Sequence, residues 1–274
     1  MSSSQNDWIA ENIFIKCLYS AHLTLNSEWF YSDEKTDYLN LVLVCSGNGI
    51  FTCEDKKYHV GRGDIVFFPN GVRRSMKSDG NHLEFRSFNF RYRLLFEHAH
   101  EWWLENPPLP LNFIEHINDS GLFHRLEQLF EQIQQHYTTR RYASSFRMRY
   151  YATEIISLLL SKRNKDISYS EQNMIEKSIK YMSEHFTEKI TLADLAAISK
   201  KSVSYYGKIF KKVLGMTPIE YLLLIRISYA KKLLENGSSI TEAASLCGFS
   251  NLYYFSKAFK SKENISPSEY KNIH

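Results

Sequence analysis

The chain has 274 residues, with 34 Lys and Arg against 30 Asp and Glu, and 43% of its residues are hydrophobic. This is the composition of a packed globular protein of about two domains, and it excludes a chain that is disordered throughout. No stretch of about 18 residues lacks charged side chains, and the first residues lack the pattern of a secretory signal. We therefore expect a cytoplasmic protein without a membrane span, whose four irregularly spaced cysteines are reduced thiols.

Residues 13–95 have the pattern of short β-strands. Runs of β-branched and aromatic residues alternate with glycine and proline, and the clearest pair of runs surrounds Gly47-Asn48-Gly49. Because Asn-Gly favours a tight turn, this segment predicts a β-hairpin. Many short strands at close spacing predict a small sandwich or barrel.

Two helices are expected after the strands. From about residue 120, apolar residues such as Phe123, Leu126 and Phe130 recur at helical spacing, and a second helix is expected over 144–162. Their apolar faces have two interpretations: they cover the strands, or they pair two subunits. The polar stretch 161–172 is the expected linker, after which the chain is helical to its end.

The last third of the chain carries the excess positive charge and an internal repeat. Residues 170–274 hold 15 basic and 10 acidic side chains, whereas residues 1–169 hold 19 and 20. A shift of 49 residues aligns Asp194–Tyr221 with Ala243–Tyr270 without a gap. The identical pairs are Tyr205/Tyr254, Lys208/Lys257, Phe210/Phe259, Lys211/Lys260, Pro218/Pro267, Glu220/Glu269 and Tyr221/Tyr270. Positive charge concentrated in a repeated segment indicates a polyanion partner.

Each copy of the repeat predicts two short helices joined by a tight turn. In the first copy, Thr191 can cap the first helix and Ser202 the second, which has an apolar face and a lysine-rich face. The residues expected to face inward are Val203, Tyr206, Ile209, Phe210 and Val213, and in the second copy Leu252, Phe255, Ala258 and Phe259. This layout is typical of a helix-turn-helix unit.

A long helix is expected between the two units, because Pro218 suits a first helical turn and Asn236-Gly237 suits its end. Such a helix would let one chain place two recognition helices in successive major grooves, about 34 Å apart. The alternative is an all-α bundle with solvated lysines. The same lysine-rich face occurs twice at a fixed spacing, which favours DNA binding.

The stretch GFSNLYYFSKAFKSKENISPSEYK resembles the C-terminal signature of the AraC-type transcription regulators, and SVSYYGKIFKKVLGMTPIEYLLLIRI resembles their first unit. The resemblance covers about residues 170–274. Two positions depart from it. Gly207 lies inside the first recognition helix, where glycine is unfavourable and offers no side chain to a base. Asn264 stands where the family usually has glycine, although asparagine also tolerates a left-handed helix end.

The resemblance implies DNA contacts for the outer faces of the two recognition helices. Lysine can hydrogen-bond guanine, serine can serve several bases, and tyrosine can pack on a thymine methyl group. The residues expected to reach base edges are Ser204, Tyr205, Lys208, Tyr253 and Lys257. The residues expected to neutralise phosphates are Lys211, Lys212, Lys260 and Lys262. Tyr254 fits an exposed contact and a partly buried position equally well.

The segment GDIVFFPNGVRRSMKS resembles the second motif of the cupin barrel, from Gly63 through Pro69 and Gly71 to Arg74. Arg74 occupies the position that is histidine in metal-binding cupins, and the preceding strands lack the HxH of the first motif. A guanidinium stays protonated and has no lone pair to offer a cation. We therefore expect no metal, no cofactor and no enzyme activity.

By the same resemblance, a barrel of this kind senses a small-molecule effector. Arg73 and Arg74 are candidates to pair with a carboxylate or phosphate on it. The aromatic residues that are candidates to stack on a sugar or ring are Trp29, Tyr31, Phe51 and Tyr58. The simpler interpretation places both arginines at a solvated rim and the aromatic residues in the core.

These features predict an α+β multidomain protein. It has a cupin-like β-barrel over 1–115, a helical dimerisation and linker region over 116–165, and an all-α domain with two helix-turn-helix units joined by a long helix over 170–274. The expected function is a sequence-specific DNA-binding transcription regulator, an activator by family analogy, that forms a homodimer, contacts RNA polymerase and responds to an effector. The alternatives are an orphan regulator with a vestigial barrel and a metal-dependent cupin enzyme fused to a DNA-binding domain.

Overall fold

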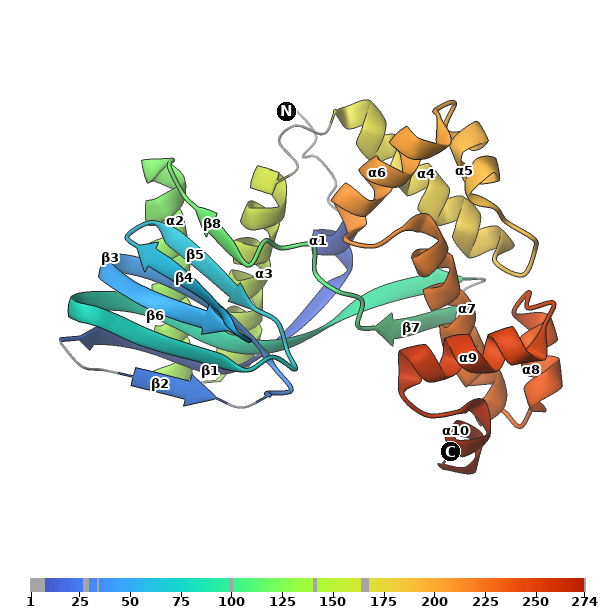
Figure 1. Cartoon of the computed structure of the whole chain (residues 1–274), viewed down its shortest axis with the longest axis horizontal. Coiled ribbons are helices and arrows are strands. Elements are labelled where there is room, and N and C mark those ends of the chain that lie inside the picture. Colours follow the sequence, from blue (N-terminus) through green and yellow to red (C-terminus); the bar gives the residue numbers. More distant parts are fainter. Residues whose placement is uncertain are drawn as a thin grey trace. The chain divides into compact units, whose positions relative to one another are not determined.

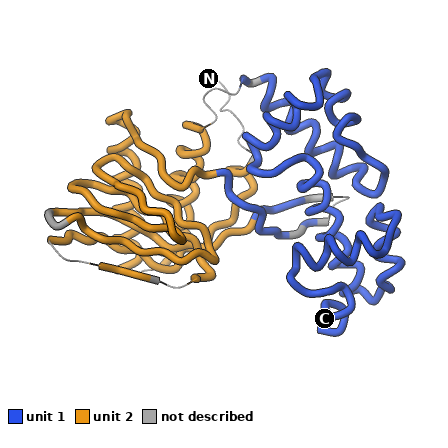
Figure 2. Tube along the Cα trace, viewed as in Figure 1, with its two compact units in different colours: residues 1–8, 94–110, 164–274 blue, residues 9–93, 111–163 orange. Residues whose placement is uncertain are grey.

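A computed structural model describes residues 8–26, 30–33, 35–98, 101–139, 142–163 and 168–273. The chain divides into two compact units (Figure 2). One contains residues 9–93 and 111–163, and we call it the sheet unit. The other contains residues 94–110 and 164–274, and we call it the helical unit. A mixed fold with an N-terminal sheet and a C-terminal helical domain confirms the predicted fold class.

Within the described residues, the sheet has eight strands in the order β1-β6-β3-β5-β8, with β2 and β7 also paired to β6 and β4 paired to β3 (Figure 1). The pairings of β3 with β4, β5 and β6 are antiparallel. A short helix, α1 (Trp8–Asn12), precedes them. The strands are β1 (Ile13–Leu25), β2 (Phe30–Asp33), β3 (Leu39–Cys53), β4 (Lys56–Gly61), β5 (Asp64–Phe68), β6 (Arg74–His98), β7 (Glu101–Glu105) and β8 (Ile114–His116).

The predicted hairpin turn at Gly47-Asn48-Gly49 is wrong, because β3 runs through these residues. The register between β3 and β6 shifts there, as in a β-bulge, and the chain turns only at Glu54-Asp55. Gly47 has a φ of 76°, and a Cβ at this position would lie 1.7 Å from the carbonyl oxygen of His82. A bulge and a turn both place glycine inside a β pattern, so the pattern alone does not separate them.

The core of the sheet unit is enclosed by the sheet itself. Strands β1, β3, β4, β5 and β6 all contribute to one buried cluster, so the sheet curls around it as a cupin-like barrel does. The cluster consists of Leu25, Val42, Val44, Phe51, Val60, Val66, Phe68, Met76, Leu83 and Phe85. The ring of Phe51 lies 6.2 Å from those of Phe68 and Phe85, between ring centroids.

Two helices, α2 (Ser120–Thr139) and α3 (Ser144–Arg163), pack on each other and on β1 (Figure 1). They confirm the two helices expected after the strands. In α2 the predicted apolar residues, including Phe123 and Leu126, are buried. Helix α3 also has apolar residues on its outer side, where Phe146 is 68% exposed and Tyr150 is 58% exposed.

The helical unit contains the two predicted helix-turn-helix units and the long helix between them (Figure 1). The first unit is α5 with α6, the second is α8 with α9, and α7 joins them. The helices are α4 (Tyr169–His185), α5 (Leu192–Ile198), α6 (Val203–Leu214), α7 (Pro218–Glu235), α8 (Ile240–Leu246), α9 (Leu252–Glu263) and α10 (Pro267–Ile273).

Residues 94–110, which we call the strap, belong to the helical unit although they precede α2 in the chain (Figure 2). The expected domains follow chain order, and the compact units differ from them here. The physical reason is apolar packing, since Leu94, Phe96 and Leu109 are all buried. The ring of Phe96 lies 5.8 Å from that of Tyr221 on α7.

Candidate nucleic-acid interface

The first helix of each helix-turn-helix unit begins with the same pattern of hydrogen bonds. Thr191 Oγ1 accepts from the backbone N–H of Asp194, and the Asp194 carboxylate accepts from that of Thr191 at 2.8 Å. Ser239 and Glu242 form the same reciprocal pair before α8. Hydrogen bonds from Thr191 lower the pKa of Asp194, and those from Ser239 lower the pKa of Glu242. Such capping boxes satisfy backbone N–H groups that a helix start leaves unpaired.

The recognition helices also begin and end alike. Ser202 caps α6, and Asn251 caps α9 by accepting from two backbone N–H groups. Helix α6 ends at Gly215 with a φ of 77°, and α9 ends at Asn264 with a φ of 63°. The left-handed helix end expected at Asn264 is therefore confirmed.

The repeat is not free of gaps, which corrects the ungapped alignment. Between the capping residues Thr191 and Ser239 the shift is 48 residues, whereas between the helix ends Gly215 and Asn264 it is 49. The turn between the helices spans residues 199–202 in the first unit and 247–251 in the second. The second turn is one residue longer, and the identities that define the repeat all lie after it.

A chain of three aromatic rings forms the same core contact in both units. The ring of Phe210 lies 5.8 Å from those of Tyr206 and Tyr221. In the second unit, the ring of Phe259 lies 5.7 Å from that of Phe255 and 5.4 Å from that of Tyr270. The rings of Phe210 and Tyr221, and those of Phe259 and Tyr270, meet edge to face with an interplanar angle of 72°. These buried contacts fix each recognition helix against the helix that follows it.

The predicted contact residues lie on the outer faces of α6 and α9. Ser204, Lys208 and Lys257 are exposed, Tyr205 is 40% exposed and Tyr253 is 77% exposed. Among the residues expected at phosphates, Lys211, Lys260 and Lys262 are exposed and Lys212 is half-buried. Each set is divided between the two recognition helices, with Ser204, Tyr205, Lys208, Lys211 and Lys212 on α6 and Tyr253, Lys257, Lys260 and Lys262 on α9.

Two residues expected to face inward are instead open to solvent. Val203 is 43% exposed and Leu252 is 44% exposed. Each is the first residue of its recognition helix, one turn before the first buried aromatic ring at Tyr206 or Phe255. Helical spacing places Val203 and Leu252 beside the inward face of their helices, but the buried core does not cover either side chain.

Tyr205 and Tyr254 occupy equivalent positions but have different contacts. The Tyr205 hydroxyl donates to Glu171 on α4, a bond that raises the pKa of Tyr205 and lowers the pKa of Glu171. Tyr254 is 49% exposed, and its ring lies 6.1 Å from that of Phe249. Tyr205 therefore has a polar partner within the protein that sequence reasoning missed, because the two residues are 34 positions apart.

The loop after α4 contacts the connecting helix α7 and the second helix-turn-helix unit. Arg226 on α7 donates from Nε to the Phe186 carbonyl oxygen at 2.7 Å and from Nη2 to that of Glu188 at 2.6 Å. A Cβ on Gly248, in the second turn, would lie 2.5 Å from the carbonyl oxygen of Thr187. The same short loop therefore contacts both α7 and the turn of the second unit, which limits changes in their spacing.

The strap is linked to the second helix-turn-helix unit by charged side chains. Glu105 accepts a hydrogen bond from the Ser228 hydroxyl on α7, and Lys231 Nζ lies 3.2 Å from its Oε1. Lys231 Nζ also lies 3.1 Å from Glu263 Oε1 at the end of α9. The two carboxylates raise the pKa of Lys231 against the opposing effect of its burial. One lysine therefore joins the strap, the connecting helix and the second recognition helix.

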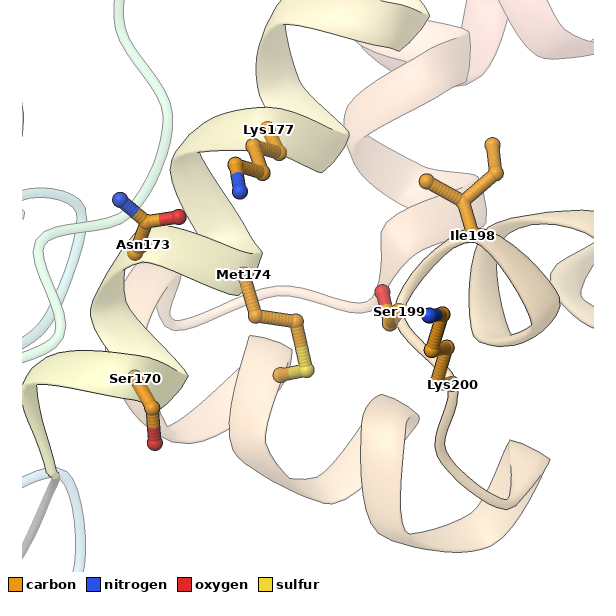
Figure 3. Close-up of a pocket in the computed structure, with 7 residues that line it drawn as sticks. All are labelled: Ser170, Asn173, Met174, Lys177, Ile198, Ser199 and Lys200. Atoms are coloured by element: carbon orange, nitrogen blue, oxygen red, sulfur yellow. The ribbon is translucent and has the colours of Figure 1, made fainter.

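A pocket of about 510 Å³ lies between α4 and the turn of the first unit (Figure 3). Lys177 lines it from α4, and Lys200 lines it from the turn, where it adopts a φ of 51°. Its other lining residues are Ser170, Asn173, Met174, Ile198 and Ser199. By hydrogen-bond position Lys200 corresponds to Gly248, so the second unit has no lysine at this place.

The structure separates the two arginines of the candidate effector site. Arg74 is 4% exposed, and its guanidinium lies 5.0 Å from the ring centroid of Tyr38 and 5.7 Å from that of Phe68. Arg73 points to solvent and pairs with Glu54 at 3.4 Å and Asp55 at 3.5 Å. The rim position expected for both arginines therefore applies to Arg73 alone.

The aromatic candidates divide in the same way. Phe51 is completely buried in the core cluster, and Tyr31 packs against that cluster. Tyr58 is half-buried, with its ring 4.4 Å from that of Phe113. Trp29 lies outside the described residues. Core packing thus accounts for Phe51, while Tyr31 and Tyr58 keep part of their surface open.

Two family models match the chain. A helix-turn-helix domain model matches residues 195–273, and a model of the AraC-like ligand-binding domain matches residues 18–149. The transcriptional activator RhaR of Mannheimia succiniciproducens is 23% identical over 245 residues, which cover 86% of this chain and 85% of that protein. The transcriptional regulator YisR of Bacillus subtilis is 33% identical over 121 residues, which cover 44% of this chain and 42% of that protein.

Among solved structures, the C-terminal domain of the response regulator AraT of Geobacillus stearothermophilus is similar, with 30% identity and a TM-score of 0.36. The match covers 37% of this chain and 85% of the AraT domain.

Within the described part of the sequence no single helix has the length and hydropathy to span a membrane. Helices α6 and α7 meet that criterion only as a pair, bent by 58°.

The double helix-turn-helix region, with an AraC-like ligand-binding domain before it, defines a DNA-binding transcription regulator. The chain belongs to the AraC-type transcription regulators.

Proposed function

We propose that α6 and α9 form one DNA-binding surface that reads two adjacent major grooves. Ser204, Lys208, Tyr253 and Lys257 contact base edges, and Tyr205 joins them once its hydroxyl leaves Glu171. The lysines that contact phosphates are Lys211, Lys212, Lys260 and Lys262. The observation that carries this proposal is that both helices, each with an N-terminal cap, a left-handed end and a chain of three aromatic rings, expose lysines at equivalent positions, Lys208 and Lys257.

Selection of bound sites from random-sequence duplex DNA tests this surface. The full-length chain at near-physiological salt is expected to enrich two short motifs about 10 base pairs apart, one for each recognition helix. A single motif would show that only one helix reads bases. Binding without enrichment, which fades as salt rises, would contradict sequence-specific recognition by the free protein.

We also propose that the sheet unit binds a small effector that carries a carboxylate or phosphate, and that Arg74 pairs with that group. A guanidinium forms paired hydrogen bonds with such anions, and burial strengthens them. Arg74 fits this role because it lies beside the core cluster and two aromatic rings, with only 4% of its surface exposed. Tyr31 and Tyr58 are the aromatic candidates whose rings remain partly open.

Adjacent arginines provide a matched test of effector binding. The protein would be screened by thermal shift against small carboxylates and phosphates, and each hit would be titrated by calorimetry. Arg74→Gln is expected to abolish binding of a hit, whereas Arg73→Gln, which changes an exposed pair with Glu54, is expected to preserve it. Equal affinities for both variants would remove Arg74 from the site, and a screen without hits would favour an orphan regulator.

The outer side of α3 supports a homodimer. Phe146 and Tyr150 lie one turn apart on α3 and are 68% and 58% exposed. Large exposed apolar side chains gathered on one element are typical of an interface. Sedimentation of the wild type at micromolar concentration is expected to give a dimer. The double variant Phe146→Ser, Tyr150→Ser is expected to give a monomer, and an unchanged dimer would place the interface elsewhere.

Three further assignments rest on analogy with family members. We propose that the protein acts in the cytoplasm, that it activates transcription through contact with RNA polymerase, and that its sheet unit has no enzyme activity. The presence of Arg74 at the cupin metal position supports the last point. Among the residues that the structure describes, no three His, Cys, Asp or Glu side chains are gathered to hold a metal ion. Metal analysis of the purified protein tests whether the sheet unit is a metal-dependent enzyme. Stoichiometric iron, manganese or zinc would contradict the proposal that it has no enzyme activity.

A further inference from the structure

Each recognition helix begins with an aliphatic side chain that the core does not cover. Val203 is the first residue of α6 and Leu252 is the first residue of α9, and they are 43% and 44% exposed. They are related by the same 49-residue shift that relates the two helix ends. Single exposed aliphatic residues are ordinary on protein surfaces. Here the exposed fraction and the helix position are the same in two copies.

The residue one turn later explains why both side chains stay open. Side chains on a helix lean toward its N-terminus, so the residue at i+4 covers the surface near residue i. That residue is Gly207 for Val203 and Ser256 for Leu252. A Cβ added to Gly207 would meet nothing within 4 Å, so the core does not require glycine there. In both copies a small residue leaves the aliphatic group accessible along the outer face.

Both side chains lie where a recognition helix meets bases. The N-terminal residues of such a helix contact base edges in the major groove. Val203 is next to Ser204, and Leu252 is next to Tyr253, two of the residues proposed to contact bases. Neither aliphatic group forms hydrogen bonds, so its partner on DNA has to be apolar. The thymine 5-methyl group is the apolar group of the major groove.

We propose that Val203 and Leu252 are specificity-determining residues that each pack on a thymine 5-methyl group, one in each half-site. This inference rests on the proposed DNA-binding surface and adds thymine positions that its lysines do not read. Gly207 and Ser256 act as positioning residues, because their small size lets the base approach the aliphatic side chain.

Replacement of thymine by uracil tests the contact directly, because it removes only the methyl group. The probe is the duplex recovered by selection, synthesised with one dU in place of each dT in turn. For the wild type, one dU in each half-site is expected to weaken binding about fourfold, which is the contribution of one buried methyl group.

The two variants assign each methyl group to its residue. With Val203→Ala, the dU effect is expected to disappear in one half-site and to persist in the other, and Leu252→Ala is expected to give the reverse. Leu246→Ala is the matched control, because Leu246 is 53% exposed on α8, outside the recognition helices. It is expected to leave both dU effects unchanged. Circular dichroism verifies that all three variants are folded.

The outcomes separate this inference from the proposed function. If the dU effects persist in both variants, or if no dU position weakens binding, Val203 and Leu252 do not read thymine, although the lysine contacts remain in place. If selection recovers no specific duplex, the proposed surface fails and this inference fails with it.

Discussion

The two helix-turn-helix units share their folding devices and differ where they meet the rest of the molecule. Both have a capping box, a left-handed helix end and a chain of three aromatic rings. The first unit ties Tyr205 to α4, whereas the equivalent Tyr254 in the second unit is 49% exposed and contacts Phe249. The second also has a longer turn and reaches the strap through Lys231. The duplicated features are those that stabilise each unit, and the divergent ones lie at surfaces that meet DNA or other segments.

The largest expected effect tests whether the two cores are equivalent. Phe210→Ala and Phe259→Ala each remove a fully buried ring at the centre of an aromatic chain. Each substitution is expected to lower the free energy of unfolding by about 3–5 kcal/mol, since it removes apolar contacts and leaves a cavity. Urea denaturation followed by circular dichroism measures this. A cost below about 1.5 kcal/mol for one variant only would show that the two cores differ.

The next effect concerns DNA reading by equivalent lysines. Lys208→Ala and Lys257→Ala are each expected to weaken specific binding by about 1–3 kcal/mol, because each removes a hydrogen-bond donor to guanine. Titration of labelled duplexes with one altered half-site assigns each loss to its own motif. Lys180→Ala, on the exposed side of α4, is the control. An unchanged affinity for either variant would remove that lysine from the base-reading set.

A smaller effect concerns the glycine inside α6. Gly207→Ala is expected to raise the free energy of unfolding by about 1 kcal/mol, because glycine is a poor helix residue and the added Cβ meets open space. The equivalent Ser256→Ala is expected to give about half that gain. Thermal denaturation of both variants compares them. Destabilisation by Gly207→Ala would mean that the helix backbone is more crowded than the structure shows.

The smallest effect concerns the two helix ends. Asn264→Gly relieves a left-handed backbone but adds chain entropy to the unfolded state, so we expect a net change of only a few tenths of a kcal/mol. Gly215→Asn is expected to be more costly, because its Cβ would lie 3.1 Å from Pro110 Cβ in the strap. Equal costs for the two exchanges would contradict the contact between the strap and the end of α6.

Local rules explain what could be predicted from the sequence. The caps at Thr191 and Ser202, the helix end at Asn264 and the alternation of buried and lysine-bearing faces all depend on residues within one or two turns. The prediction of a hairpin turn at Gly47 failed because the β-bulge found there has the same residue composition as a turn. The exposure of Val203 depends on where the core ends, which periodicity does not report.

The same local rules do not predict contacts between residues that are far apart in the sequence. The pair of Glu105 with Lys231 joins residues 126 positions apart, and neither belongs to a motif. Arg74 and Arg73 are neighbours in the sequence with the same side chain, yet one is buried and the other pairs with Glu54 at the surface. Arg74 is the first residue of β6 and Arg73 lies just before that strand, and which of the two faces the core becomes known only when the strand pairs.

The strap also has a consequence for cleavage of the chain. A protease cut between Arg163 and Ser168 would break the only peptide connection from α3 to α4, yet the N-terminal fragment would retain the strap. Phe96 would still pack on Tyr221, and Glu105 would still hold Lys231. The nicked protein is therefore expected to migrate as one species on a native gel and to separate only in denaturant. A separately expressed 170–274 fragment would instead expose the face of α7 that the strap covers.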